Sequence, residues 1–439
     1  MSEKSKNETK DKKMESLVPY TCLFVDAEFS DFRHALTKCL SFGLDRKKII
    51  EDIENIWKNE KNKNHVLPCL SVRSGLDLYL KVMNFPPGSE VIMSAINIPD
   101  MVHVVRHHNL KVVPLDISIE TTEPKVELLP HLVTDKTVAI LIAHIYGKWC
   151  DMDPIIEAAQ QYNLIVIEDC AESFCGYHRL GDPRSDVALF SFGVIKYCTS
   201  FGGAIVKIRD QLLYDKMMQT YNQYPTQKSS EYLTKICKYM FFFGSLEMST
   251  GIMYICRSLN IDYKSFFLKL LRGFPKDMLR RIKHKPSTPL LSTMKRRFEN
   301  FKQSEFENAQ VKGEYARQRL PENAQLIGMK AKINNYWLFP ILVDTPDEIL
   351  HWLNAVGVEA YRGATQLNII EPENDVNTDD ISQLHPCYPA EARYLIDHVI
   401  YLPIHKNVPF HELNKICKAV HYALKMSKDS PRVRLQSKL

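Results

Sequence analysis

Residues 186–206 contain two short apolar runs joined by a turn, and they read D-V-A-L-F-S-F-G-V-I-K-Y-C-T-S-F-G-G-A-I-V. The first run covers 187–192 and the second begins at Ala204, just after a glycine pair, so both have the character of β-strands. Lys196 lies between them in apolar surroundings. Burial lowers the pKa of a lysine and makes its amine a nucleophile suited to a Schiff base. The alternative is a surface lysine in a hairpin turn.

A second apolar run, 164–169, reads L-I-V-I-E-D and ends on two carboxylates. A nearly continuous apolar run is typical of a strand buried on both faces of a parallel sheet. Ligands of open α/β sheets lie outside the carboxyl ends of the strands, so we expect Asp169 at the ligand edge. A lysine and an aspartate there match the needs of pyridoxal 5′-phosphate. The lysine amine would form an imine with the cofactor aldehyde, and the aspartate would keep the ring nitrogen protonated. Asp169 could instead be a helix N-cap or a turn residue.

The composition is that of an ordinary globular protein with more than one lobe. The chain has 439 residues, 45% of them hydrophobic and 25% charged, and this length exceeds what one hydrophobic core usually serves. Its net charge of +5 is too weak to argue for nucleic acid, but it is compatible with a small anionic substrate. Eleven irregularly spaced cysteines without a secretory signal predict reduced thiols and a cytoplasmic protein.

Strands and helices alternate through the first half of the chain. Strands are expected at 90–93, 111–117 and 138–145, with helices at 76–83 and 155–162, the latter opened by Asp153 as N-cap and Pro154. This order predicts a parallel α/β sheet with right-handed crossovers. Further along, strands at 336–343 and 357–361 with helices at 347–356 and 409–426 predict a small α+β lobe that closes over the large one.

We therefore divide the chain into seven parts. They are a disordered tail (1–15), a helical arm (16–64), the large α/β domain (65–210), a helical insertion (211–306), a connecting helix (307–330), the small α+β domain (331–427) and a C-terminal tail (428–439). The insertion is rich in aromatic and basic residues. For its segment 236–259 we favour a buried helical insertion over contact with a membrane surface or a membrane span, because a spanning helix needs about 20 mostly apolar residues.

Residues 71–75 open a helix directly after a strand. Helix N-termini in this position attract phosphate, so we expect a phosphate cradle built from hydroxyls, backbone amides and Arg73. An ordinary helix N-cap is the alternative.

Taken together, the motifs resemble those of the DegT/StrS-type sugar aminotransferases, which belong to the aspartate-aminotransferase fold superfamily. The resemblance covers about 66–423. Its specific pieces are E-D-C-A-E at 168–172, Ser191-Phe192 ahead of Lys196, G-G-A at 202–204, H-I-Y-G at 144–147 with D-M-D-P at 151–154, G-S-E-V-I at 88–92 and Y-L-P-I-H at 401–405. It implies the pyridoxal-phosphate transferase type I fold: a large domain with a mostly parallel central sheet flanked by helices, plus the small domain.

The resemblance also implies roles for single residues. Lys196 would bind the cofactor covalently and move the proton between substrate and cofactor, and Asp169 would pair with the ring nitrogen. Ser191, with amides around Arg73 and Ser74, would hold the phosphate. Glu172 stands where the family often has Gln or His near the cofactor hydroxyl, and Asn97 is placed among the cofactor-binding residues. No metal is implied, and the family's active sites form at a homodimer interface.

Some positions depart from the family pattern. The Ser-Gly-Thr phosphate turn appears as Ser71-Val72-Arg73, the aromatic residue that stacks on the ring is replaced by Ile98, and the insertion lacks a sugar-binding signature. The expected function is transfer of an amino group from glutamate or a similar donor to a keto sugar or nucleotide-linked keto sugar. A pyridoxal-phosphate-dependent lyase or dehydratase and a catalytically degenerate cofactor-binding protein are the alternatives.

Overall fold

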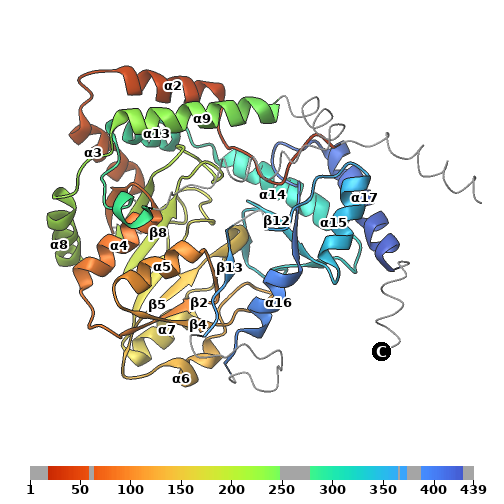
Figure 1. The fold of residues 1–439 in the computed structure, drawn as a ribbon, viewed down its shortest axis with the longest axis horizontal. Helices are drawn as coiled ribbons and strands as arrows, with labels where there is room; N and C mark the ends of the chain where they lie inside the picture. Colours follow the sequence, from red (N-terminus) through yellow and green to blue (C-terminus); the bar gives the residue numbers. More distant parts are fainter. Residues whose placement is uncertain (1–17, 59–63, 248–276, 364–365, 373–386, 429–439) are drawn as a thin grey trace, which may run out of the picture.

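The computed structural model describes residues 18–58, 64–247, 277–363, 366–372 and 387–428, which form a large and a small lobe (Figure 1). The expected tail 1–15 and nearly all of the expected tail 428–439 lie outside these residues, as does the second half of the segment 236–259. None of the helices in the described residues combines the length and apolar character needed to cross a membrane.

The large lobe is built on a seven-stranded sheet with the order β1-β9-β8-β7-β5-β2-β4. Its strands are β1 (His65–Cys69), β2 (Glu90–Ser94), β4 (Lys111–Leu115), β5 (Thr137–Ala143), β7 (Ile165–Asp169), β8 (Val187–Ser191) and β9 (Ala204–Ile208). The strands from β8 to β4 run parallel, and β9 runs antiparallel to both of its neighbours. The mostly parallel sheet is as the sequence predicts, and the runs around Lys196 are adjacent strands of it.

Helices cover both faces of this sheet because both faces of its strands are apolar. Along β5, Ala139 and Leu141 belong to one buried cluster, and Ile140 and Ile142 belong to another. The first cluster lies under helices α4 (Val72–Met83), α5 (Pro99–His107) and α8 (Gln211–Asn222), and the second lies under α7 (Asp153–Tyr162). Strand residues therefore alternate between two cores, which explains the continuous apolar runs.

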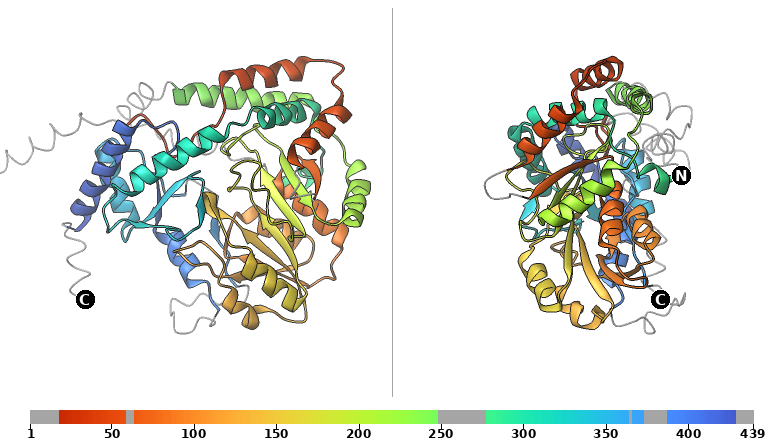
Figure 2. Two further views of the ribbon diagram at one scale, coloured as in Figure 1. Left: turned by 180° about the vertical axis from the view of Figure 1, so that it is seen from behind. Right: turned by 90° about the vertical axis from the view of Figure 1, so that its left-hand side faces the viewer.

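A layer of helices lies across the end of the sheet, at the top of Figure 1 and in both views of Figure 2. It consists of α2 (Phe29–Leu40) and α3 (Arg46–Trp57) from the arm, with α9 (Ser229–Glu247) and α13 (Thr288–Glu299) from the insertion. The short helix α12 (Met278–Arg281) packs instead in the cluster of α4, α5 and α8. Helix α9 packs along α2 and α13. The fully buried ring of Trp57 meets Phe190, Phe192 and Phe298, so the arm is fixed to the large lobe by aromatic packing.

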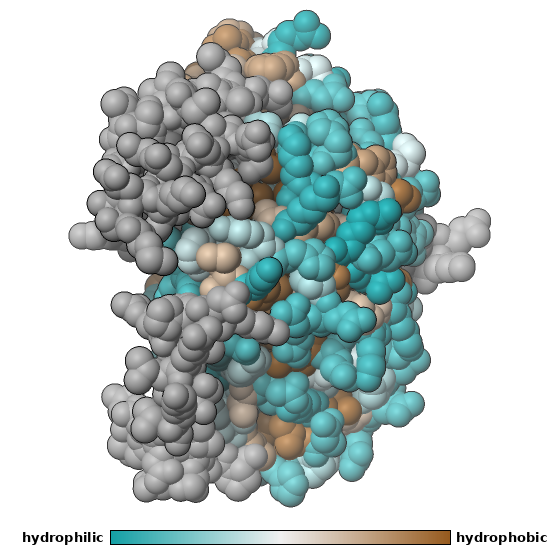
Figure 3. Space-filling view, turned by 90° about the vertical axis from the view of Figure 1, so that its right-hand side faces the viewer, coloured by the Kyte–Doolittle hydropathy of each residue, from teal (hydrophilic) through white to brown (hydrophobic). Residues whose placement is uncertain are grey.

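The small lobe packs helices against a three-stranded antiparallel sheet with the order β10-β12-β14. Its elements are α14 (Gln303–Arg317), β10 (Gln325–Leu326), β12 (Phe339–Leu342), α15 (Pro346–Ala355), α16 (Ala390–His398), β14 (Val399–Leu402) and α17 (Phe410–Lys428). The coloured surface of this side of the molecule is mostly hydrophilic, with apolar residues scattered between polar ones (Figure 3).

Two short strand pairs connect the lobes. In one, β11 (Ile333–Asn334) pairs with β6 (Lys148–Trp149), and in the other β13 (Asn368–Ile369) pairs with β3 (Ile96–Asn97). Both pairs join the segment that follows a sheet strand to a segment of the small lobe. The small lobe is therefore held at the edge of the sheet where the site residues were expected. Short 3-10 turns, η1 (Val126–Leu128) and η2 (Ile145–Gly147), and helix α6 (Leu129–Leu132) complete the described elements.

Three local predictions are wrong. The connecting helix expected at 307–330 ends with α14 at Arg317, because Pro321 cannot continue it, and β10 follows. The expected strand at 357–361 is not formed, and only Tyr361 makes an isolated bridge, to Tyr401. Val358 and Ala360 are buried in the core of the small lobe. Their burial explains the alternating apolar pattern, although the segment does not form the backbone hydrogen bonds of a strand. The helix expected to be capped by Asp153 has Met152 as its N-cap, and Asp153 lies in its first turn, where a carboxylate still favours the helix dipole.

Candidate active site

The predicted site residues follow strands whose carboxyl ends meet at one edge of the sheet. Asp169 is the last residue of β7, Ser191 is the last residue of the neighbouring β8, and Lys196 follows in the loop between β8 and β9. Because these strands are adjacent and parallel, their last residues point to one place. A cavity of about 220 Å³ lies there, bordered by Arg73, Asn97, Asp169, Glu172, Ser191 and Lys196.

The Lys196 amine lies between a carboxylate and an aromatic ring. Its Nζ is 3.3 Å from Glu172 Oε1 and 3.7 Å from the centre of the Trp337 ring. Burial lowers the pKa of Lys196 below its usual value, and the Glu172 carboxylate opposes this shift. Glu172 is itself fixed, because its Oε2 accepts a hydrogen bond of 3.0 Å from the amide of Tyr146. The burial of this side chain therefore argues against the alternative of a surface lysine in a hairpin turn.

Trp337 comes from the small lobe and was not singled out from the sequence. Its Nε1 donates a hydrogen bond of 2.6 Å to the carbonyl of Ile195, directly before the lysine. The side chain is buried, and its ring also borders the cavity. In the sequence Trp337 looks like one more apolar residue at the start of a strand, so nothing local indicates its contact with a lysine 141 positions away.

Asp169 is buried, and its carboxylate has few donors. Oδ1 accepts a hydrogen bond of 3.1 Å from the amide of Ala171, and Oδ2 accepts a long one of 3.5 Å from Asn97 Nδ2. Burial raises the pKa of Asp169, while the Ala171 amide and the Lys196 ammonium lower it. Oδ2 can therefore take a further donor from a molecule in the cavity.

The start of α4 differs in detail from the expected phosphate cradle. Ser71 is the N-cap: its Oγ accepts a hydrogen bond of 3.2 Å from the amide of Ser74, and the two hydroxyls are 3.0 Å apart. Ser71, Val72 and Arg73 border the cavity, but Ser74 does not. Arg73 Nη1 donates a hydrogen bond of 2.6 Å to Asp100 at the start of α5. The N-cap and the cradle interpretations are thus both compatible with this turn.

Gly203 brings backbone close to the cavity beside the start of α4, where its amide donates a hydrogen bond of 3.2 Å to the carbonyl of Leu70. It has φ of 87°, and a Cβ built on it would lie 2.6 Å from Met294 Sδ. Only glycine fits this conformation and this space without a shift. The pair Gly202-Gly203 borders the cavity next to Ser191.

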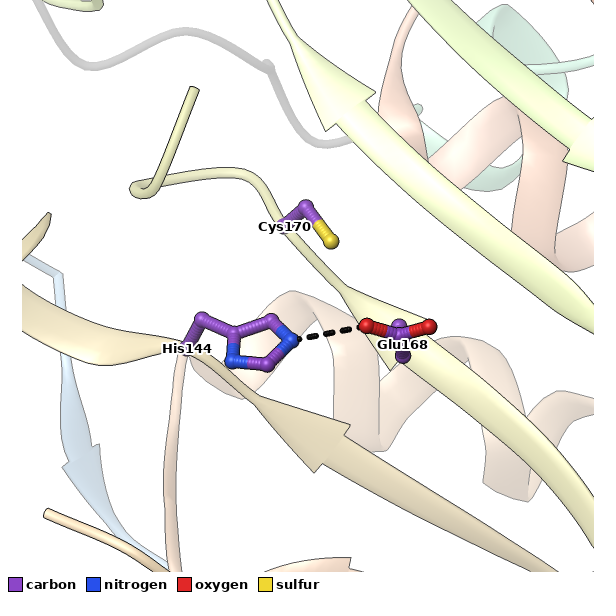
Figure 4. A group of neighbouring side chains, drawn as sticks. All are labelled: His144, Glu168 and Cys170. Carbon is purple, nitrogen blue, oxygen red and sulfur yellow. Dashed lines mark hydrogen bonds and ion pairs between the residues drawn. The ribbon is translucent and has the colours of Figure 1, made fainter. Parts of the chain in front are cut away.

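At the wall of the cavity, which His144 borders, His144, Glu168 and Cys170 form a buried group (Figure 4). The amide of Cys150 donates to His144 Nδ1 at 3.0 Å, so the ring proton is on Nε2, which donates to Glu168 Oε2 at 3.0 Å. Glu168 Oε1 accepts a further hydrogen bond of 2.7 Å from the amide of Asp182. These groups could ligate a metal, but the hydrogen bonds already use both nitrogens and both oxygens, and they fix the end of β7 beside Asp169.

The fold and this cavity define an α/β protein with a buried lysine–carboxylate pair at the carboxyl edge of its sheet. The structure of NtdA from Bacillus subtilis, with the bound cofactor PMP, aligns with a TM-score of 0.65 and 17% identity, covering 94% of this chain and 87% of that one. Residues 37–245 match the model of the DegT/DnrJ/EryC1/StrS aminotransferase family. This stretch makes up just under half of the chain.

Two curated relatives are similar in sequence. The GDP-perosamine synthase of Escherichia coli O157:H7 is 30% identical over 193 residues, which are 40% of this chain and 53% of the relative. The GDP-perosamine synthase of Caulobacter vibrioides is 24% identical over 347 residues, 77% of this chain and 82% of the relative. The chain thus spans about half the length of the first relative and most of the second.

Proposed function

We propose that the protein is a pyridoxal-5′-phosphate-dependent aminotransferase. The single observation that carries this proposal is that Lys196 and Asp169 border one buried cavity, and that each shifts the pKa of the other. When bound, this cofactor supplies an electron-withdrawing ring that stabilises negative charge on a substrate carbon. The match to the model of this aminotransferase family and the fold of the structural relatives support the same cofactor.

The residues present fit this group. Asp169 Oδ2 has room for a donor, and a protonated ring nitrogen would supply one together with a positive charge. Lys196 would hold the cofactor aldehyde and, as a buried amine with a lowered pKa, would take and return a proton at Nζ. Glu172 and Trp337 would orient the amine, and Ser191 would donate to the phosphate from the end of β8.

For the substrates, we propose glutamate or a similar amino donor and a keto sugar linked to a nucleotide as acceptor. The proposal is supported by the GDP-perosamine synthases among the relatives. The homodimer and the cytoplasmic location stay predictions from the family and the cysteines. Lyase chemistry on the same cofactor, or cofactor binding without turnover, are the competing functions.

The test is a spectrum of the protein loaded with pyridoxal 5′-phosphate. We expect a band near the violet edge of the visible spectrum that Lys196→Ala abolishes and that Lys330→Ala, at an exposed lysine, leaves unchanged. Glutamate should bleach the band and release 2-oxoglutarate, whereas a lyase would consume its substrate without leaving the aminated cofactor. A full band in Lys196→Ala would refute the role of this lysine.

A further inference from the structure

Helix α9 of the insertion sends two side chains into the cavity. Lys235 and Tyr239 both border it, and a spacing of one helical turn places them on the same face of the helix. The helix is docked at this face, because the buried Tyr232 donates a hydrogen bond of 2.8 Å from its hydroxyl to the carbonyl of Ser200. Lys235 is therefore carried by a fixed wall of the cavity.

Lys235 adds positive charge to a part of the cavity that already contains Arg73. Burial lowers the pKa of Lys235, and the cations Arg281, Arg73 and Lys238 lower it further, against the opposing effect of Glu231. Two cations that face one cavity favour an anion between them, since an anion offsets their repulsion and replaces lost hydration.

The start of α4 supplies few side-chain donors for such an anion. Val72 has no hydroxyl, and the Ser74 hydroxyl meets Ser71 rather than the cavity. Arg73 shares its guanidinium with Asp100 at 2.6 Å. A phosphate bound here would have backbone amides, Ser71 and Ser191 as neutral donors, and Arg73 as a cation that Asp100 partly neutralises. A second cation would complete the charge balance of a dianion.

We propose that Lys235 binds the phosphate of pyridoxal 5′-phosphate, so that the insertion helix α9 supplies part of the cofactor site. The proposal rests on the proposed function for the cofactor itself, but it assigns a new residue and a new element to it. It also gives the insertion a role: α9 replaces donors that the start of α4 lacks. Lys238, nearly one turn further along α9, does not border the cavity and serves as a matched control.

The test compares two ligands that differ only in the phosphate. Apoprotein of the wild type, Lys235→Met, Lys235→Arg and Lys238→Met is titrated with pyridoxal 5′-phosphate and with pyridoxal, and binding is followed by absorbance. We expect Lys235→Met to weaken binding of the phosphorylated ligand roughly ten- to a hundredfold, as for a lost charge-assisted hydrogen bond, and to leave binding of pyridoxal unchanged. Lys235→Arg should restore most of the affinity, and Lys238→Met should behave as the wild type.

The outcomes separate this inference from the proposed function. Two results would overturn this inference and leave the cofactor proposal standing. One is that wild type and Lys235→Met bind the phosphorylated ligand with equal affinity. The other is that Lys235→Met weakens the binding of both ligands by the same factor. If Lys235→Met instead weakens only the binding of GDP to the loaded protein, the phosphate is that of a substrate and the inference is wrong. A wild type that binds neither pyridoxal compound overturns the proposed function and this inference with it. Circular dichroism confirms that each variant is folded.

Discussion

Replacing Glu172 by Gln tests how the site controls the charge of Lys196. The Glu172 carboxylate is 3.3 Å from the amine, and the two side chains are only 9% and 16% exposed. Glutamine keeps the shape of the side chain and an oxygen that can accept the hydrogen bond of the Tyr146 amide. The substitution therefore removes the negative charge, and it turns an NH2 group toward Lys196 in place of the oxygen that accepts its hydrogen bond, and both changes disfavour the ammonium.

The size of the effect follows from the distance. Two unit charges 3.3 Å apart attract by about 1.3 kcal/mol at the dielectric constant of water and by about 5 kcal/mol at an effective value of about 20. Loss of the carboxylate should therefore lower the pKa of Lys196, because burial then acts without this opposing charge. The amine would then be neutral, and able to attack an aldehyde, at more acidic pH.

The assay is the rate of covalent attachment of pyridoxal 5′-phosphate as a function of pH, with the product trapped by borohydride and located by mass spectrometry. The midpoint of this profile should move to lower pH in Glu172→Gln. The control is Glu120→Gln, which removes a carboxylate from an exposed ion pair with Lys330 and should leave the midpoint in place. An unchanged midpoint, or one moved to higher pH, would refute the argument that Glu172 holds the proton on Lys196.

Two further predictions concern buried charges outside the cavity. Burial lowers the pKa of Lys148 from 10.5 to about 7, so between these values the unfolded chain binds a proton that the folded chain lacks, and stability rises with pH. Urea unfolding measures this effect. Between pH 7.5 and 9.5, the unfolding free energy of the wild type should rise by about 2–3 kcal/mol more than that of Lys148→Met. The same difference between the two proteins at both pH values would contradict this prediction. Lys406 and Arg297 outweigh burial and lower the pKa of Asp26, so its stabilising effect is present at neutral pH and is lost in acid. Asp26→Asn should cost roughly 3 kcal/mol at pH 7 in urea unfolding, because it leaves these cations without one of their carboxylate partners, and an unchanged value would disprove that estimate.

The sequence predicts the edge of the sheet well because strand ends are local features. The run that ends at Asp169 and the runs on either side of Lys196 need only their apolar pattern and the geometry of parallel sheets to be brought together. Ser74 was expected at the cavity because it stands in the same turn as Arg73, but the helix begins at Val72 and turns the Ser74 hydroxyl toward the N-cap. The rotation of a first helical turn depends on which residue caps it, and the pattern alone does not decide this.

The contacts that complete the site come from segments distant in the chain. Trp337 reaches the lysine loop from the small lobe, and Lys235 reaches the cavity from the insertion. Both residues look ordinary in the sequence: one lies in the expected apolar strand 336–343, and the other is one of two lysines in a helix that also has two glutamates. Their roles depend on how the small lobe and α9 pack against the sheet, which is a property of the tertiary structure.

The loop that carries Lys196 is the point where these segments meet, and its backbone shows why they are needed. Cys198 and Phe201 have φ of 55° and 63°, a conformation that costs a non-glycine residue about 1–3 kcal/mol. Three parts of the chain form hydrogen bonds with this loop. The Cys198 amide donates to Asp26 Oδ2 of the arm at 2.6 Å. Tyr232 of α9 donates to the carbonyl of Ser200, and Trp337 of the small lobe donates to the carbonyl of Ile195. Each of these bonds comes from a different part of the chain, so the arm, the insertion and the small lobe all help to stabilise the strained turn. The position of the amine is thereby a product of the whole fold, although the lysine itself stands out in a stretch of twenty-one residues.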